Sequence, residues 1–364
     1  MTRELRAASI GAMLPVSALA PVTRDANAVP RLSWLDTFRG AAVVLMIETH
    51  VANTFLEADL RGTAWFTALT YLNGLVAPSF LFIAGFVQGA GWKGGLGKPV
   101  SFWRRAQRLG WIAWIGYGLH FPFPQLWKGD WAGAIWQGTQ VDVLPCLAVS
   151  LLVLLALTWG AQRLPVAWRS GVWWGVLGSL AFGVIVASPV MTNWPALSVP
   201  IPLRAFLNAS TGSLFPLFSW SAFVFCGAIC GAMARLPVTL RLLAMLVVVG
   251  LGQTIPSASF SAMSPEFFFE RLGWVMGLAM LCEWLLRDRP NPDSWLSFAG
   301  RESLVMYVAH LCLIFYSADA GVLPEMELPV GATLAWTAVV MLFTFAIALA
   351  KSRWQSASAR LVPA

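Results

Sequence analysis

Long apolar runs separated by short polar stretches occupy almost the whole chain. Ten of these runs are about twenty residues long, the length that an α-helix needs to cross the hydrocarbon core of a bilayer. The runs are continuous rather than alternating between apolar and polar positions, which disfavours a membrane β-barrel. The predicted helices cover roughly residues 35–56, 66–90, 107–123, 142–160, 171–190, 214–234, 240–256, 270–287, 295–317 and 330–350. We therefore expect an all-α, polytopic membrane protein with about ten transmembrane helices.

The composition supports this class and places nearly all of the chain in one domain. Of the 364 residues 58% are hydrophobic and 11% are charged, whereas soluble domains carry about a quarter charged residues. We expect a flexible N-terminal tail at 1–30, a transmembrane domain at 31–350 and a cytoplasmic tail at 351–364. The first segment carries features of a weak signal peptide, although its prolines favour a disordered cytoplasmic tail.

The positive charge predicts how the helices are oriented. A net charge of +7 suggests nucleic-acid binding at first, but its distribution points to topology instead. With the N-terminus inside, 20 of the 24 Lys and Arg residues fall on the cytoplasmic side. The four on the other side are Arg61, Lys128, Arg204 and Arg271. By the positive-inside rule, both termini are then cytoplasmic. The expected location is the inner (plasma) membrane, with the lipid bilayer as surroundings and no nucleic-acid partner.

The first predicted helix carries a line of polar residues. Eleven residues at about 100° each make three turns plus about 20°, so Arg39 and His50 lie almost on one line about 16 Å apart. Asp36 falls about 40° from His50, and Asn53 extends the stripe by another turn. An ionisable group facing lipid costs at least a few kcal/mol, so this stripe must face protein or water. Glu48 lies about 160° from His50 and is expected to pair with another helix.

The three histidines all belong to predicted membrane helices. His50, His120 and His310 are each expected in the outer half of the bilayer. Ser303 lies within about 20° of His310 on its helix, with Tyr307 nearby. Each histidine could simply form an interhelical hydrogen bond, but buried ionisable groups in membranes are commonly functional. The chain has no HExxH motif and no CxxC pair, so we expect no metal site and five free, buried cysteines.

A basic, Gly-rich loop follows the second helix. It spans 91–108 and contains Arg104, Arg105 and Arg108, but it lacks the GxxxxGK[ST] spacing of a nucleotide-binding loop. The loop could act only as a topology determinant. Alternatively, its guanidinium groups could bind phosphate oxygens.

Several of these motifs, taken together, resemble a known family. Arg39 and His50, with ten residues between them, resemble the first-helix signature of transmembrane acyltransferases. That signature is shared by the acyltransferase type 3 family and the heparan-α-glucosaminide N-acetyltransferase catalytic-domain family. Four further motifs occur in the expected order and favour the second family, at 77–85, 141–144, 215–220 and 300–310. Two departures are Pro145, where Gln is usual, and Ser219, where Pro is usual.

The resemblance implies an enzyme that moves an acyl group, expected to be acetyl, from cytoplasmic acyl-CoA (acetyl-CoA). The acceptor would be a hydroxyl or amine of an extracytoplasmic glycan or lipid-linked sugar. The expected catalytic residues are His50, Arg39 and Asp36, and the expected acyl-CoA ligands are Arg104, Arg105 and Arg108. The expected acceptor-binding residues are His310, Ser303, Tyr307, His120 and Asn53. An acyl-histidine intermediate is the covalent variant of this chemistry.

Other functions also fit the sequence pattern. Ten helices with Pro and Gly breaks and a buried charged line are typical of a membrane transporter or lipid flippase. No inverted repeat relates the two halves of the chain, which argues against that class. A non-catalytic membrane subunit is a third alternative, and a homo-oligomer is left open.

Overall fold

The computed structural model describes residues 32–96, 99–195, 199–255, 261–262, 264–286, 294–319 and 325–361. The chain divides into two units, residues 1–31 and residues 32–364. The predicted N-terminal tail and Lys98 of the basic loop lie outside the described residues. The second unit forms a helical bundle, and all of the predicted site residues belong to it.

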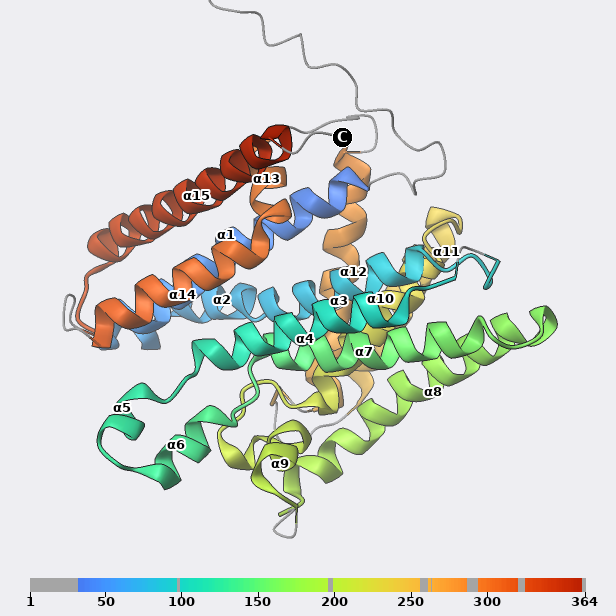
Figure 1. Cartoon of the computed structure of the whole chain (residues 1–364), viewed down its shortest axis with the longest axis horizontal. Helices are drawn as coiled ribbons and strands as arrows, with labels where there is room; N and C mark the ends of the chain where they lie inside the picture. Colours follow the sequence, from blue (N-terminus) through green and yellow to red (C-terminus); the bar gives the residue numbers. More distant parts are fainter. Residues whose placement is uncertain are drawn as a thin grey trace, which may run out of the picture. The chain divides into compact units, whose positions relative to one another are not determined.

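The described part of the bundle is built from helices, without a β-strand (Figure 1). The longer helices are α1 (Ser33–Phe55), α2 (Ala64–Asn73), α3 (Val76–Ala90), α4 (Phe102–Leu119), α7 (Val143–Ala161), α8 (Val166–Asn193), α10 (Leu217–Ala232), α11 (Val238–Thr254), α12 (Pro265–Leu286), α14 (Ser303–Asp319) and α15 (Val330–Leu361). Shorter ones are η1 (Ala58–Gly62), α5 (Phe123–Trp127), α6 (Trp131–Gly138), α9 (Ile201–Leu207), η2 (Ala209–Thr211) and α13 (Trp295–Arg301). Each of the ten predicted segments therefore contains helix, and the all-α fold class is confirmed.

Two of the segments predicted as single helices are broken. The segment 66–90 divides into α2 and α3 around Gly74 and Leu75. Pro78 explains this break, because it cannot donate a hydrogen bond to the carbonyl of Gly74 four residues earlier and its ring would clash with it. The segment 295–317 divides into α13 and α14, which meet at an angle of 85°. Glu302, between them, forms an ion pair of 2.6 Å with Lys351 of α15.

Two helices extend beyond the bounds predicted for them. α4 begins at Phe102, so Arg104, Arg105 and Arg108 stand on its first turns rather than in a loop. α15 continues to Leu361, so most of the predicted tail at 351–364 is helical. Short helices also fill loops in which none was predicted, as in α5, α6 and α9.

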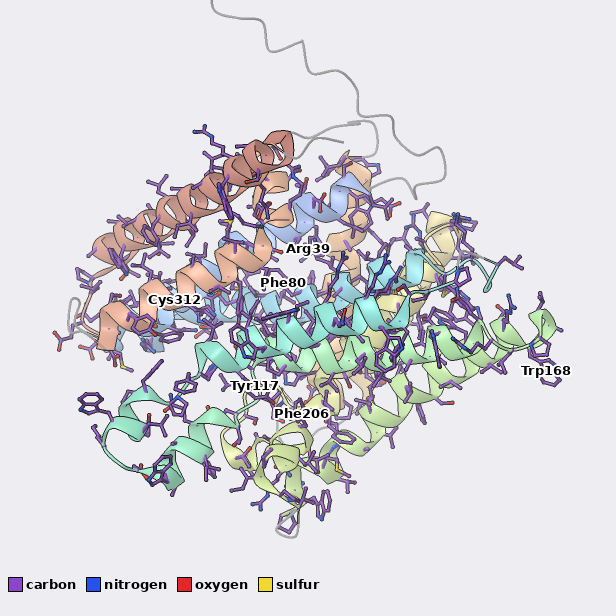
Figure 2. The ribbon with its side chains drawn as sticks, viewed as in Figure 1. Arg39, Phe80, Tyr117, Trp168, Phe206 and Cys312 are labelled. Carbon is purple, nitrogen blue, oxygen red and sulfur yellow. The ribbon has the colours of Figure 1, made fainter. Side chains whose placement is uncertain are left out.

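Four helical stretches among the described residues are long and apolar enough to cross a membrane: Ala64–Ala90, which is α2 and α3 taken together, Val143–Ala161, Val166–Asn193 and Val330–Ser358. The bent pair α13 and α14 makes a fifth if it forms one span. The count of ten spans and the orientation of the helices stay predictions. Trp168, near the start of α8, is exposed and points away from the neighbouring helices (Figure 2).

Two glycines let α1 and α13 approach at backbone distance. A Cβ added to Gly40 would lie 1.9 Å from the carbonyl oxygen of Leu296, and one added to Gly300 would lie 1.8 Å from that of Asp36. The hydroxyls of Thr37 and Ser297 lie 2.7 Å apart in the same contact. Small residues at helix crossings are typical of membrane proteins, because packing rather than water expulsion drives association there. This crossing fixes the first half of α1 against the start of the bent pair.

The buried apolar side chains form two main clusters. One includes Phe82 of α3, Phe223 of α10 and Phe268 of α12. The other includes Ile47 of α1 and Ile314 of α14, together with residues of α15. Helices α1 and α14 therefore lie side by side (Figure 1), and the candidate site is formed along their contact.

Candidate functional site

The polar stripe of α1 lies on one uninterrupted helix. α1 runs from Ser33 to Phe55 without a break, so Arg39 and His50 are three turns apart, about 16 Å along the axis. Nη1 of Arg39 lies 3.8 Å from Oδ1 of Asp36, one turn earlier. Asp36 is buried and Arg39, labelled in Figure 2, is half-buried. The structure thus brings Asp36 beside Arg39, as a residue that could orient the guanidinium.

His50 and His310 form a pair between α1 and α14. Their ring centroids are 5.2 Å apart with an interplanar angle of 44°. Phe315, five residues after His310 on α14, lies with its ring at 72° to that of His50 and with the centroids 6.2 Å apart. His310 has no exposed surface, whereas His50 is half-buried. Figure 2 labels Cys312, two residues beyond His310 on α14. Of the two residues, His50 is therefore the more exposed.

The hydrogen bonds of His310 define its two ring nitrogens. Nδ1 lies 2.9 Å from the carbonyl oxygen of Met306, and a carbonyl can only accept, so Nδ1 carries a proton. Nε2 is buried and has no hydrogen-bond partner among the described residues. In the neutral imidazole, this Nε2 is an acceptor. A buried acceptor without a partner is rare in native proteins and requires an explanation.

Tyr307 and Asp142 extend the cluster next to His310. The hydroxyl of Tyr307 donates to Oδ2 of Asp142 over 2.6 Å. The ring of Tyr307 stands edge-on to His310, with centroids 5.7 Å apart. Asp142 is 8% exposed and also interacts electrostatically with His50. Side chains from α1, α14 and the residue preceding α7 thus converge on one buried polar cluster.

Asp142 was not among the predicted site residues, although it belongs to the motif at 141–144. It directly precedes α7, where an Asp normally caps the helix by accepting a backbone N–H. Here its side chain makes no capping hydrogen bond, because the carboxylate binds Tyr307, 165 residues away in the chain. The sequence signal was a carboxylate at the start of an apolar helix. Nothing local distinguishes it from an ordinary cap.

The remaining predicted acceptor-binding residues lie outside this cluster. Ser303 begins α14, seven residues and about 10 Å before His310. Asn53 is exposed, and its carbonyl accepts a hydrogen bond of 2.6 Å from Arg61. His120 ends α4, with Nδ1 3.3 Å from the carbonyl of Gly116. Of the five predicted acceptor-binding residues, His310 and Tyr307 are the two whose contacts join them to the histidine pair.

The three arginines predicted to bind the donor share the first turns of α4. Arg104, Arg105 and Arg108 are all exposed, and Nη1 of Arg105 donates to the side chain of Gln88 over 3.2 Å. The N-terminus of a helix carries partial positive charge and free N–H groups. Guanidinium groups beside it are suited to phosphate oxygens. This surface is chemically able to hold an anionic group.

Two half-buried acidic residues elsewhere in the bundle are paired with other helices, as the sequence predicts for Glu48. Glu48 is hydrogen-bonded to the side chain of Asn73 at the end of α2. Glu283 of α12 forms an ion pair of 2.6 Å with Arg241 of α11. Because these partners lie away from α14, neither acidic residue is part of the histidine cluster.

An apolar cavity lies near the first turn of α1. Trp34, Phe86 and Met276 line it, with the ion pair of Arg241 and Glu283 at its wall. Trp34 and His50 are sixteen residues apart on α1, about 24 Å along the axis. The cavity therefore lies away from the histidine pair.

The structure also gives a physical account of one departure from the family pattern. Ser219 has φ 73° and ψ −50° within α10, a left-handed conformation that L-residues rarely adopt. Its hydroxyl donates to the carbonyl of Ala262 over 2.9 Å. Proline, whose φ is locked near −65°, cannot take this conformation. The kink seen here is therefore incompatible with the residue usual at that position.

No group of three metal-ligating side chains was found among the described residues. All five cysteines are free, with Cys146 buried and the others half-buried. The histidine cluster therefore offers imidazole, phenol and carboxylate groups for chemistry.

Comparison with known proteins identifies the family of this chain. No curated protein matches the chain. The model of the family described as heparan-alpha-glucosaminide N-acetyltransferase, catalytic, matches residues 31–245. The match includes Arg39, His50 and Asp142 but ends within α11, before His310 and Tyr307. It supports a membrane transferase of the acetyltransferase type. Because the match covers more than half of the 364 residues, the chain belongs to the heparan-alpha-glucosaminide N-acetyltransferase catalytic family.

Proposed function

We propose that this protein transfers an acyl group, in the first instance acetyl, from cytoplasmic acyl-CoA to a sugar on the other side of the membrane. The observation that carries the proposal is the pairing of His50, on the helix that also bears Arg39, with the buried His310 of α14, in a member of an acetyltransferase family. The acceptor is a hydroxyl or amine of an extracytoplasmic glycan or lipid-linked sugar. The protein works as a multi-pass protein of the inner membrane.

The donor would enter at the cytoplasmic end of the polar stripe. Arg104, Arg105 and Arg108 are exposed at the N-terminus of α4 and are free of ion pairs among the described residues, so they would hold the phosphates of CoA. The acyl thioester would extend past Arg39 towards His50, a separation of about 16 Å. Asp36, 3.8 Å from Arg39, would hold its guanidinium in place.

His50 would act as the general base. As the acceptor attacks the thioester carbonyl, its O–H or N–H bond breaks and the proton moves to His50. A C–O or C–N bond forms, the C–S bond breaks, and the CoA thiolate leaves with the electron pair. The imidazolium then returns its proton to the thiolate or to water. Such a base contributes about 10²–10⁴-fold to a rate. In the covalent variant, His50 itself carries the acyl group between the two steps.

A transporter or lipid flippase is the second candidate, and two broken helices favour it. α2 and α3 are interrupted at Gly74, and α13 and α14 meet at 85°. Discontinuous helices form the substrate sites of many transporters. Both functions would use a buried histidine, so loss of function in a His50 variant does not separate them.

The fate of the acyl label separates them. Purified protein would be reconstituted into vesicles with its cytoplasmic side facing outward and glucosamine enclosed in the lumen, and radiolabelled acetyl-CoA would be added outside. An acyltransferase releases free CoA and places the label on glucosamine or on the protein. His50→Ala should bind acetyl-CoA with near-normal affinity and transfer nothing, because binding and proton transfer reside in different groups. Wild-type protein that never consumes acetyl-CoA with any sugar offered, yet moves a solute in a His50-dependent way, would establish the transporter instead.

A further inference from the structure

The unpartnered Nε2 of His310 points to a role beyond holding two helices together. We infer that His310 is a positioning residue that fixes which nitrogen of His50 carries the proton, and that Tyr307 and Asp142 hold His310 in place for this task. The inference rests on the proposed function for its catalytic meaning. The claim that His310 fixes the protonated nitrogen of His50 rests on the contacts among the two histidines, Tyr307 and Asp142.

The hydrogen bonds of His310 fix its protonation state. Its Nδ1 proton is committed to the carbonyl of Met306, 2.9 Å away. The ring is completely buried, and Nε2 finds no acceptor or donor among the described residues. A neutral ring held in this way must present a lone pair at Nε2. It therefore needs a hydrogen-bond donor.

His50 is placed to be that donor. Its ring centroid lies 5.2 Å from that of His310. At this separation, two facing imidazole nitrogens are about 3 Å apart, the length of an N–H···N hydrogen bond. In the observed arrangement Nε2 of His310 has no partner among the described residues and the interplanar angle is 44°, so the His50 ring would have to turn for the two nitrogens to meet. Catalytic hydrogen bonds are often loose before substrate binds and tighten afterwards.

The consequence concerns the other nitrogen of His50. If one nitrogen donates its proton to His310, the second nitrogen is left unprotonated and faces the open side of the pair. That nitrogen is the one able to take a proton from an acceptor, or to attack an acyl group. In the Ser-His-Asp triad the carboxylate holds the histidine tautomer in the same way. Here a neutral imidazole would replace the carboxylate.

Tyr307 and Asp142 keep the lone pair of His310 available. The single proton of Tyr307 goes to Asp142 over 2.6 Å, so the phenol cannot donate to Nε2 and compete with His50. Its ring instead packs edge-on against His310. Asp142, the acidic residue that interacts electrostatically with His50, would stabilise the positive charge that His50 gains during the reaction. Glu48 lies about 160° from His50 on α1 and its side chain is bonded to Asn73, so it is directed away from the pair.

The structural part can be tested without any activity measurement. The chain has three histidines, so ¹⁵N-labelled histidine gives three resolvable imidazole spin systems in detergent micelles. His50→Gln and His120→Gln assign them. We expect His310 to be protonated at Nδ1, and His50 to hold one tautomer that becomes mixed in His310→Leu. A His310 proton on Nε2, or a His50 spectrum that is unchanged in His310→Leu, would overturn the inference.

The catalytic part is tested by a matched pair of substitutions. In His310→Gln, a carbonyl oxygen can accept in place of Nε2, whereas His310→Leu fills a similar volume without an acceptor. We expect His310→Leu to lower kcat by about 10²–10⁴-fold, as a wrong tautomer does in the triad. His310→Gln should recover at least about tenfold of that loss, with the KM for acetyl-CoA unchanged in both.

One further variant, read together with the experiments above, keeps the outcomes distinct. Tyr307→Phe removes only the hydroxyl and should lower kcat several-fold without changing acetyl-CoA binding. Equal activity of the Gln and Leu variants of His310, both folded by size-exclusion chromatography, would contradict the positioning role. If wild-type protein transfers no acyl group, the proposed function fails, and the tautomer spectra still decide whether His310 fixes His50.

Discussion

Replacing Gly40 with alanine tests how the site depends on helix packing. The added Cβ would lie 1.9 Å from the carbonyl oxygen of Leu296. The obstacle is backbone, so no rotamer change can relieve it, and α1 must move away from α13 by roughly 1 Å. Overpacking of this kind costs about 3 kcal/mol or more, and the better helix propensity of alanine offsets about 1 kcal/mol of it. We expect a net loss of about 2 kcal/mol in the free energy of unfolding.

The same movement should also lower the rate of acyl transfer. Gly40 follows Arg39 directly and lies ten residues before His50, and a displacement of about 1 Å can lower a rate about 10²-fold. Stability would be measured by SDS titration in micelles, and transfer by release of CoA. Gly175→Ala is the matched control, because Gly175 stands inside α8 with nothing within 4 Å of its added Cβ.

The two glycine variants give opposite expectations. Gly175→Ala should leave transfer unchanged and should not lower stability, since alanine is the better helix former. The reasoning would be refuted if Gly40→Ala were as stable and active as Gly175→Ala. The close approach of α1 and α13 would then not constrain the site.

Three further predictions concern other parts of the chain. Replacing Arg104, Arg105 and Arg108 with Glu should raise the KM for acyl-CoA far more than the KM for the acceptor. An unchanged KM for acyl-CoA in correctly inserted protein would show that these residues only set the orientation of the helices. On intact cells, Lys128→Cys should react with an impermeant thiol reagent, and Lys93→Cys, which is also exposed, should not. The reverse pattern would show that the predicted orientation is wrong. Glu283→Gln should lower the free energy of unfolding by about 1 kcal/mol, because the pair with Arg241 is partly exposed. A double-mutant cycle with Arg241→Met measures that coupling, and a value near zero would contradict it.

The sequence predicted the helices because apolar length is a local signal. All ten predicted segments contain helix. The break at Gly74 could also have been predicted, since Pro78 cannot donate a hydrogen bond to the residue four positions earlier. The bend at Glu302 could not have been predicted, because no proline marks it. It coincides with the close contact between Gly300 and α1 at Gly40, a residue far away in the chain.

The candidate site was predictable only in part, for the same reason. Helical geometry placed Asp36, Arg39 and His50 on one line of α1, and the continuous helix agrees with that placement. The histidine pair and the bond between Asp142 and Tyr307 join segments far apart in the sequence. No period or spacing encodes such a contact. Ser303 shares the face of His310 by periodicity, but two helical turns separate them along α14.

The histidine pair lies between α14 and α1, and α1 is fixed near both ends, which suits a site that needs precise geometry. Towards its start, α1 is locked to α13 through Gly40 and Gly300, and α14 follows α13 almost directly. At its other end, the backbone N–H of Leu328 donates to Phe55 over 2.8 Å, which ties α1 to the segment leading into α15. His50 lies between these two contacts, so its separation from His310 is set by the helix backbones rather than by a loop. An acyltransferase requires such a fixed separation, because a base displaced by about 1 Å loses most of its advantage.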